Sequence, residues 1–441
     1  MKTCSSWLLA CMLSAGVITV GETVKDREGA VRSDRAAMEN DPRWIYNDWE
    51  RGFSEAKRTG KPVLVVLRCV PCLACAGIDA QVLEEAELAP LLDQFVCVRL
   101  INANSLDLSI FQFDYDLSFS TMFFNGDRTV YGRYGSWTHQ RDAQNETTAG
   151  FKRALEGALA LHRQYPGIKA QLAGKAGDAF SFKSPLEMPT IAGKYARDLN
   201  WEGKVVQSCV HCHQVGDAMR ASFRDAMQPI PEQWVYPFPT PETIGLTLDP
   251  GHAARVESIA PGSIAGKSGF RAGDDLLTLD GQPLLSIADV SWALHRAPAS
   301  GSIPALVKRS ETNANLQIAL PPEWRKNSDI SRRVGTWPMR AMALGGLVVE
   351  DLPDDERTRW GLPKNQLALR VKHVGQYSKH AAAKHAGVHK DDILIEFDGI
   401  STRMSEGALI GHLLQKRSRG DRVEVTVLRG SEKVSLNLPM Q

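Results

Sequence analysis

The pattern of apolar and polar residues changes several times along the chain, beginning with a short apolar run, Trp7–Val20, that follows Lys2. This run is too short to cross a bilayer comfortably, so it predicts a cleaved secretory signal over residues 1–21. Residues 22–41 are charged and polar without a helical or strand period, which predicts a linker. We therefore expect export to the periplasm or cell envelope, with membrane association only through the N-terminal segment.

A globular α/β domain is predicted over residues 42–165. Two continuous apolar runs, Val63–Leu67 and Phe95–Leu100, are typical of buried strands. A further strand, Thr121–Phe124, is followed by an Asn-Gly turn, which indicates a hairpin. A helix is expected over residues 149–165, and Gly60 is expected to end an earlier helix.

The C-terminal half contains an internal repeat, in which Gly273–Gly281 matches Asp391–Gly399. A repeat with such long units predicts a duplicated domain rather than a solenoid. We place the two copies at residues 242–320 and 344–440, with residues 321–343 between them. Residues 166–240 have a weaker pattern and end in a proline-rich stretch, which predicts a stiff connector.

Composition constrains the function only by exclusion. A chain of 441 residues with 43% hydrophobic residues can form about three domains with ordinary cores. The formal net charge is +1 and Lys and Arg form no runs, so no nucleic-acid partner is expected. The function must therefore be sought in local sites.

Cysteine spacing supplies the first chemical candidates. Five cysteines form two tight clusters, and Cys97 lies alone in an apolar run, where it is expected to be a buried core residue. Clusters of this kind indicate redox or metal chemistry rather than a disulfide scaffold. The clustered residues are Cys69, Cys72, Cys75, Cys209 and Cys212.

The domain at residues 42–165 resembles thioredoxin-like proteins. The resemblance rests on Lys61-Pro62, the apolar strand, the cysteine cluster and the later hairpin. The family's spacing from the Lys-Pro lysine implies Cys72 as nucleophile and Cys75 as resolving thiol, at a helix start that stabilises a thiolate. The alternative register pairs Cys69 with Cys72.

One departure from the family pattern concerns Leu117–Thr121, which contains no proline where redox-active members carry a cis-proline. Substrate docking at that loop is therefore in doubt. Two other segments, Gln112–Leu117 and Tyr131–Gly135, resemble a bacterial envelope family that joins a thioredoxin-like domain to PDZ domains and includes selenoproteins.

The two repeat copies resemble PDZ domains of the bacterial envelope-protease type. In such domains a glycine-containing loop binds a C-terminal carboxylate, and the next strand accepts the peptide as an added strand. The resemblance places peptide binding at Gly245 and Leu246 in the first copy and at Gly346 and Leu347 in the second. The first is expected to bind more readily; alternatively, residues 321–343 plug one groove. The chain contains no serine-protease motif.

The segment Cys209–His213 has the Cys-x-x-Cys-His pattern of c-type haem attachment. Two thiols would bind the vinyl groups, and His213 would bind the iron. Met219 or Met227 would be the distal ligand. The alternatives are a zinc-type cluster that includes His211, or a structural disulfide. No nucleotide cofactor is expected.

Together these patterns predict a multidomain protein, α/β plus β-rich: a thioredoxin-like domain, a small Cys-x-x-Cys-His segment and two PDZ domains. The leading hypothesis is an exported thiol–disulfide or electron-transfer protein, a candidate thiol–disulfide oxidoreductase, with a candidate c-type haem and PDZ domains that recruit a protein partner. The alternative is a non-catalytic envelope adaptor or scaffold. Thiol reactivity distinguishes the two, since an adaptor needs no activated cysteine.

Overall fold

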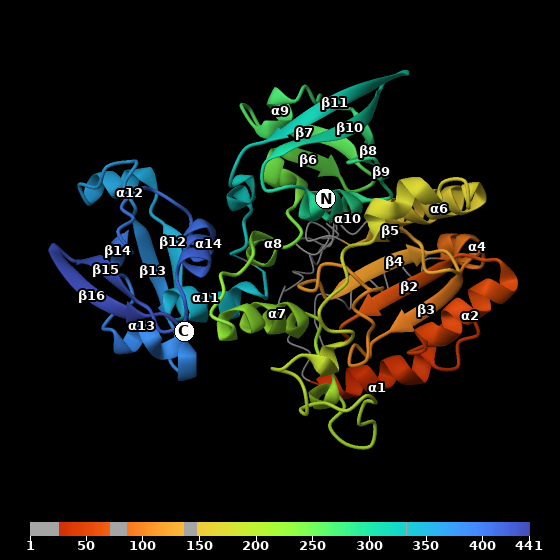
Figure 1. The fold of residues 1–441 in the computed structure, drawn as a ribbon, viewed down its shortest axis with the longest axis horizontal. Coiled ribbons are helices and arrows are strands. Elements are labelled where there is room, and N and C mark those ends of the chain that lie inside the picture. Colours follow the sequence, from red (N-terminus) through yellow and green to blue (C-terminus); the bar gives the residue numbers. More distant parts are fainter. Residues whose placement is uncertain (1–25, 71–85, 136–147, 332) are drawn as a thin grey trace, which may run out of the picture.

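A computed structural model of the chain describes residues 26–70, 86–135, 148–331 and 333–441 (Figure 1). The expected signal segment and the predicted pair Cys72 and Cys75 lie outside these residues. The described part of the chain forms three sheets, and each sheet has its own hydrophobic core. Figure 1 shows the third sheet at one end of the molecule, joined to the rest by α7 (His213–Asp225) and α8 (Glu232–Val235).

The first sheet has the order β1-β3-β2-β4-β5. Its central strand β2 pairs parallel to β3 and antiparallel to β4, and all six of its residues are buried. Successive side chains of a strand face opposite sides, so Leu64 and Val66 join one core while Val63 and Val65 join the other. The strands are β1 (Trp44–Tyr46), β2 (Val63–Arg68), β3 (Val96–Leu100), β4 (Phe119–Phe124) and β5 (Val130–Tyr134).

Helices cover both faces of this sheet. Helix α2 (Trp49–Thr59) supplies Phe53 to one core, and α6 (Thr148–Gln164) supplies Phe151 to the other. Gly60 has φ 71° at the C-terminus of α2, so the predicted helix end is confirmed. The short helices η3 (Ala86–Leu88) and α4 (Ala89–Leu92) precede β3.

The prediction of a linker over residues 22–41 was wrong, because Arg27–Met38 form a helix, α1. Asp26 caps this helix by accepting a hydrogen bond from the Gly29 amide. Val31 is its one buried residue, so its amphipathic period is too weak to be recognised in the sequence. The helix is held instead by a buried ion pair between Asp34 and Arg99 of β3.

The second and third sheets share one topology, which confirms the predicted duplication. The second runs β11-β10-β8-β7-β6 and the third β12-β13-β14-β15-β16, so β6 and β12 each end their strand order. The second sheet's strands are β6 (Leu246–Asp249), β7 (Arg255–Ile259), β8 (Asp275–Leu279), β9 (Gln282–Pro283), β10 (Gly301–Arg309) and β11 (Thr312–Leu320). Those of the third are β12 (Leu347–Asp351), β13 (Leu369–Val374), β14 (Ile393–Phe397), β15 (Arg422–Arg429) and β16 (Glu432–Pro439).

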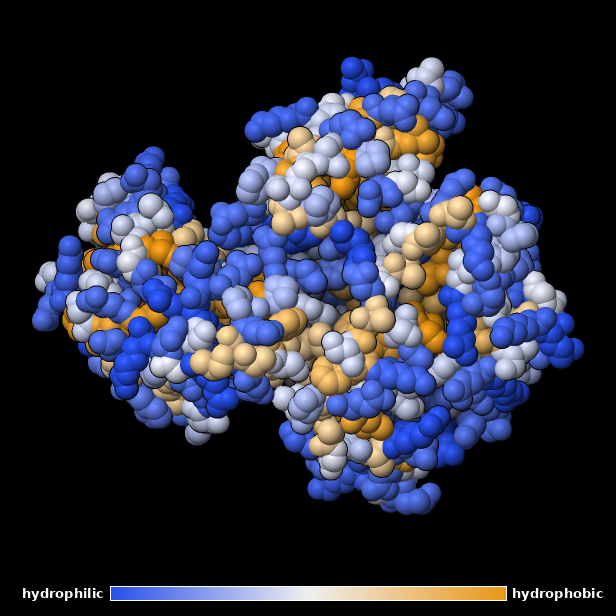
Figure 2. Space-filling view, in the orientation of Figure 1, coloured by the Kyte–Doolittle hydropathy of each residue, from blue (hydrophilic) through white to orange (hydrophobic). Residues whose placement is uncertain are grey.

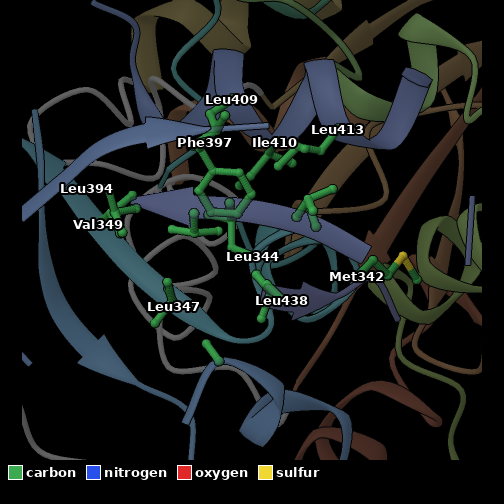
Figure 3. Close-up of a cluster of buried hydrophobic side chains, with 14 of the residues drawn as sticks. Met342, Leu344, Leu347, Val349, Leu394, Phe397, Leu409, Ile410, Leu413 and Leu438 are labelled. Atoms are coloured by element: carbon green, nitrogen blue, oxygen red, sulfur yellow. The ribbon is translucent and has the colours of Figure 1, made fainter. Parts of the chain in front are cut away.

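Each of these two domains packs one main helix on its sheet, α10 (Ile287–Arg296) in the second and α14 (Glu406–Lys416) in the third. Figure 3 shows the third core, where Leu409, Ile410 and Leu413 of α14 lie over Phe397 and Leu344. The shorter helices are η8 (Pro241–Ile244), α9 (Ile264–Lys267), α12 (Asp354–Arg359), η10 (Ser378–Ala381) and α13 (Ala382–His385).

Residues 166–240 pack closely against the domains they join. Helix α7 places Val215 and Met219 in a core of the first sheet, while Arg224 at its other end donates to the Gln441 carbonyl. The segment also contains η5 (Lys169–Lys175), η6 (Pro185–Glu187) and η7 (Val206–Ser208). Between the repeat copies lie η9 (Trp324–Asn327) and α11 (Thr336–Leu344). Within the described residues, helices long and apolar enough to cross a membrane are absent.

The second sheet's domain is fixed to the first sheet through a buried carboxylate, Asp289 of α10. It accepts a hydrogen bond from the Arg133 amide of β5 and lies 2.9 Å from the Lys175 ammonium. Both charged side chains are fully buried. The Arg133 guanidinium also stacks 3.7 Å over the Trp292 ring of α10. The contact between these two domains therefore contains an ion pair, Lys175 with Asp289, that is shielded from water.

We predict that Asp289→Ala lowers the free energy of unfolding by about 3–5 kcal/mol, because it leaves the Lys175 charge buried and unpaired. The control is Asp178→Ala. Asp178 pairs with Arg296 but its side chain is 87% exposed, so its loss should cost less than about 1 kcal/mol. Urea unfolding of the full chain measures both effects. An equal loss of unfolding free energy in the two variants would contradict the proposed role of the Lys175–Asp289 pair.

Candidate functional site

Cys69 lies directly after β2, at the carboxyl end of the central strand of the first sheet. Its backbone amide donates to the Ser118 carbonyl at 2.9 Å, in the loop that precedes β4. This is the loop in which the sequence lacks the cis-proline of related proteins. In open α/β sheets this end of the strands is where ligands and reactive groups gather.

The connector brings the second cysteine cluster to the same end of the sheet. Buried Asn104, in the loop after β3, accepts a hydrogen bond from the Val210 amide at 2.7 Å. It also donates to the Ser208 carbonyl at 2.8 Å. Val210 is itself buried in a core of the first sheet. Residues 208–210 are thus held between the sheet and the start of α7.

A narrow cavity of about 20 Å³ lies between Cys69 and the connector cysteines, with room for about one water molecule. Cys69, Cys209 and Cys212 line it together with His211 and Arg68. The remaining lining residues are apolar: Val31, Val70, Ile101, Ala103, Leu199, Val205, Val206 and Val210. Segments far apart in the sequence therefore form one thiol-rich site.

His211 lies close enough to Cys69 for proton exchange, with 3.3 Å between its Nδ1 and the Cys69 Sγ. Burial lowers the pKa of His211, and the nearby His213 and Arg27 lower it further. The imidazole is therefore neutral at neutral pH and can take a proton from the thiol. A cysteine paired with such a base is the usual form of an activated thiol nucleophile.

The two connector cysteines differ in their surroundings. The Cys209 Sγ lies 3.5 Å from the Ile101 carbonyl oxygen, and burial raises the pKa of this thiol to about 11. Cys212 is the N-cap residue of the 13-residue helix α7, where the positive end of the helix dipole favours a thiolate. Cys97 is 1% exposed, so its predicted place in the core is confirmed.

The residues present do not fit a covalently attached haem. A haem needs both thiols and the iron ligand to share one open space, but the cavity between the thiols is only about 20 Å³. His213 is absent from its lining and lies 3.3 Å from Asp217. Met219 is buried in a core and Met227 is 55% exposed, and neither lines this cavity. For the described residues, groups of three or more metal-ligating side chains at binding distance are also absent.

A larger cavity of about 180 Å³, which the sequence did not indicate, lies between the loop before β4, residues 177–181, α7, α8 and α10. Several aromatic side chains line it among charged and small residues, and His295 stacks on Phe238 with 4.4 Å between ring centroids. Burial lowers the pKa of His295 to about 3. Its other aromatic residues, Phe113, Tyr115, Phe180, Trp234 and Trp292, are too scattered along the chain to form a motif.

In the third sheet's domain, the predicted peptide groove beside β12 is already used by the chain itself. The Val349 amide donates to the Glu406 carboxylate at 3.0 Å, and the Arg340 Nε donates to the same oxygen at 2.9 Å. The Gly346 amide donates to the Arg340 carbonyl at the end of α11, and the Gly245 amide of the second sheet's domain donates likewise to the Glu242 carbonyl. The Val349 donor on β12 is thus occupied by Glu406, which Arg340 also binds, and this favours the alternative that residues 321–343 block one groove.

The groove beside β6 in the second sheet's domain has a different composition. Helix α10 begins at Ile287, directly after the capping Ser286. Helix α14 begins at Glu406 in the same position, directly after the capping Ser405. Ile287 has no atom that can accept a hydrogen bond from β6. Gly245 has φ 85°, and a Cβ there would lie 2.2 Å from the Ser263 Cβ, so only glycine fits this loop.

The domains of the second and third sheets also stand apart on the surface of the molecule. Figure 2 shows a mainly hydrophilic face, with apolar residues gathered toward the middle of the molecule and a deep notch between the domains of the second and third sheets. The two peptide-groove candidates thus belong to separate lobes.

Comparison with known proteins identifies two of the predicted domain types. A family model described as thioredoxin-like matches residues 44–126, and a PDZ domain model matches residues 255–309. The chain therefore contains a thioredoxin-like domain and a PDZ domain, as the sequence predicted. No curated protein matches the chain.

Similar solved structures include the HtrA-type protease AlgW with a decapeptide, which is 17% identical, covers 31% of this chain and 40% of that chain, and has a TM-score of 0.20. AlgW with a tripeptide is 16% identical, covers 30% and 41%, and has a TM-score of 0.19. The chain spans about two fifths of the length of these structures.

We predict that iodoacetamide labels Cys69 and Cys212 faster than Cys97 and Cys209 near pH 7.5. Burial raises the pKa of Cys97 to about 12 and that of Cys209 to about 11, so both remain protonated. Mass-spectrometric mapping after limiting alkylation measures the order. The difference should vanish in denaturant, and equal rates in the native protein would contradict the assignment.

We predict that Ile287→Glu weakens binding of C-terminal peptides at least tenfold. The new carboxylate would repel the peptide's own carboxylate and accept hydrogen bonds from β6, as Glu406 does on β12. Fluorescence anisotropy on the full chain, with a peptide selected from a C-terminal library, measures the affinity. Ile287→Leu and Glu406→Gln are the controls and should leave it unchanged. Unaltered binding by Ile287→Glu would show that peptides do not use the β6 groove.

Proposed function

We propose that this protein is an exported thiol–disulfide exchange protein whose first PDZ domain recruits a protein partner. The observation that carries the proposal is the pairing of the Cys69 thiol with the His211 imidazole, 3.3 Å apart, at the carboxyl end of β2. Export rests on the apolar segment within residues 1–21.

The chemistry follows from the protonation states of this pair. Thiol–disulfide exchange proceeds by attack of a thiolate on a disulfide sulfur. Neutral His211 accepts the Cys69 proton, and the resulting imidazolium stabilises the thiolate beside it. Cys69 is half-buried rather than enclosed, so an extended partner segment can reach its sulfur.

The PDZ domain supplies recognition that the thiol site lacks. The loop before β4 has Ser118 instead of a proline, so docking of a partner strand there is weaker than in related redox proteins. A second contact through β6 would compensate, since strand addition uses backbone hydrogen bonds that any sequence can make. Such a peptide contact is micromolar at best, about −8 kcal/mol, so exchange of partners stays fast.

We predict that, in a Cys72→Ser and Cys75→Ser background, Cys69→Ser removes the fastest phase of the reaction with Ellman's reagent at neutral pH. His211→Ala should slow it about tenfold or more at pH 7, because the proton acceptor is lost. The deficit should shrink above pH 9, where the thiol ionises without help. Cys97→Ser is the matched control and should react as the unaltered protein does. Slow, uniform reaction of every thiol in the unaltered protein would favour the adaptor hypothesis.

A further inference from the structure

The connector cysteines face the thioredoxin-like cysteine rather than an open space. We propose that Cys212 is the resolving thiol for Cys69 and that Cys209 then completes a disulfide with Cys212. This relay rests on the proposed thiol–disulfide function and gives the Cys-x-x-Cys-His segment a redox role instead of a haem-binding role.

The geometry limits which thiol can attack a mixed disulfide on Cys69. Cys69, Cys209 and Cys212 line one cavity of about 20 Å³, whose other walls are mostly apolar. A partner sulfur bound to Cys69 enters a space with no room for an external thiol besides it. Among the residues that the structure describes, the other cysteines lining this cavity are Cys209 and Cys212, which makes the connector the source of the next attack.

The connector is also held firmly enough to present these thiols. Three hydrogen bonds join the Asn104 side chain to the Ala196 and Ser208 carbonyls and to the Val210 amide. The Glu28 carboxylate of α1 accepts from the Val205 and Val206 amides at 3.0 and 3.1 Å. The connector therefore approaches Cys69 as part of a packed unit, which keeps the reacting sulfurs near each other.

The order of the two connector thiols follows from their positions. Cys212 is the N-cap residue of the 13-residue helix α7, so the positive end of the helix dipole favours its thiolate. Cys209 lies 3.5 Å from the Ile101 carbonyl oxygen, an arrangement that holds the protonated thiol. Cys212 therefore attacks first, and Cys209 reacts last.

The relay balances without any further reactant. The Cys69 thiolate attacks a partner disulfide, forms a mixed disulfide and releases one partner thiolate. Cys212 attacks the Cys69 sulfur, which breaks the mixed disulfide, releases the second partner thiolate and forms a Cys69–Cys212 bond. Cys209 attacks Cys212, releases Cys69 and leaves a Cys209–Cys212 disulfide. Two electrons pass to the partner, and the two connector thiol protons end on the partner's thiols.

The test uses the full chain with Cys72→Ser and Cys75→Ser as background, so that the thiols under study are Cys69, Cys97, Cys209 and Cys212. One equivalent of Ellman's reagent per chain serves as the disulfide, because the relay regenerates the Cys69 thiol and excess reagent would modify it again. We expect release of two thionitrobenzoate ions at this site, and peptide mapping should find a Cys209–Cys212 disulfide. Adding Cys212→Ser should leave one thionitrobenzoate on Cys69 and slow the second release at least tenfold. Adding Cys209→Ser should instead trap a Cys69–Cys212 disulfide. Adding Cys97→Ser should change nothing.

The outcomes separate the relay from the function on which it rests. If Cys69 forms no adduct at all, the thiol–disulfide function fails. If Cys69 keeps its adduct while Cys212 is intact, or Cys212→Ser resolves as fast as its parent, only the relay is overturned. A Soret band on exported protein that disappears with Cys209→Ala and Cys212→Ala would also overturn it. The trapped Cys69–Cys212 bond in Cys209→Ser supports it and shows that the variant keeps its fold.

Discussion

The arrangement of the candidate site depends on the buried side chain of Asn104. Its amide group forms hydrogen bonds with three backbone groups of the connector. This one residue therefore joins the loop after β3 to the Cys-x-x-Cys-His segment. Loss of that side chain would leave buried backbone groups unpaired, at about 1–3 kcal/mol each. The amide is neutral and fully paired, so it fixes the connector without placing a charge beside the thiols.

Buried charge pairs determine how the other segments dock. Asp34 with Arg99 holds α1, Lys175 with Asp289 holds α10, and Arg333 reaches Asp114 and Asp116 from the segment between the repeat copies. Burial raises the pKa of Asp114 to about 6. Desolvation cancels much of the attraction in such pairs, so they add little net stability. Breaking a pair, however, leaves one buried charge without its partner. Each pair therefore disfavours any arrangement in which its segment packs elsewhere.

The sequence predicted what short-range patterns encode. The apolar runs of β2 and β3, the helix end at Gly60 and the repeated turns at Gly273 and Asp391 each depend on a few neighbouring residues. It did not predict α1, whose burial rests on Val31 and a distant partner, Arg99. It also assigned the two cysteine clusters to separate sites. Only the folded connector brings His211 to Cys69, and no local spacing records that approach.

The two repeat copies share a fold but have diverged where a ligand would bind. Glu406 is favourable at a helix N-terminus on dipole grounds alone, so in the sequence it resembles an ordinary first-turn residue. In the structure it ties α14, β12 and Arg340 of α11 together. The same domain holds the far end of α7, because Arg224 donates to the Gln441 and Arg417 carbonyls. Since Cys212 stands at the other end of α7, this domain also fixes the axis of the helix that begins at a cysteine of the candidate site.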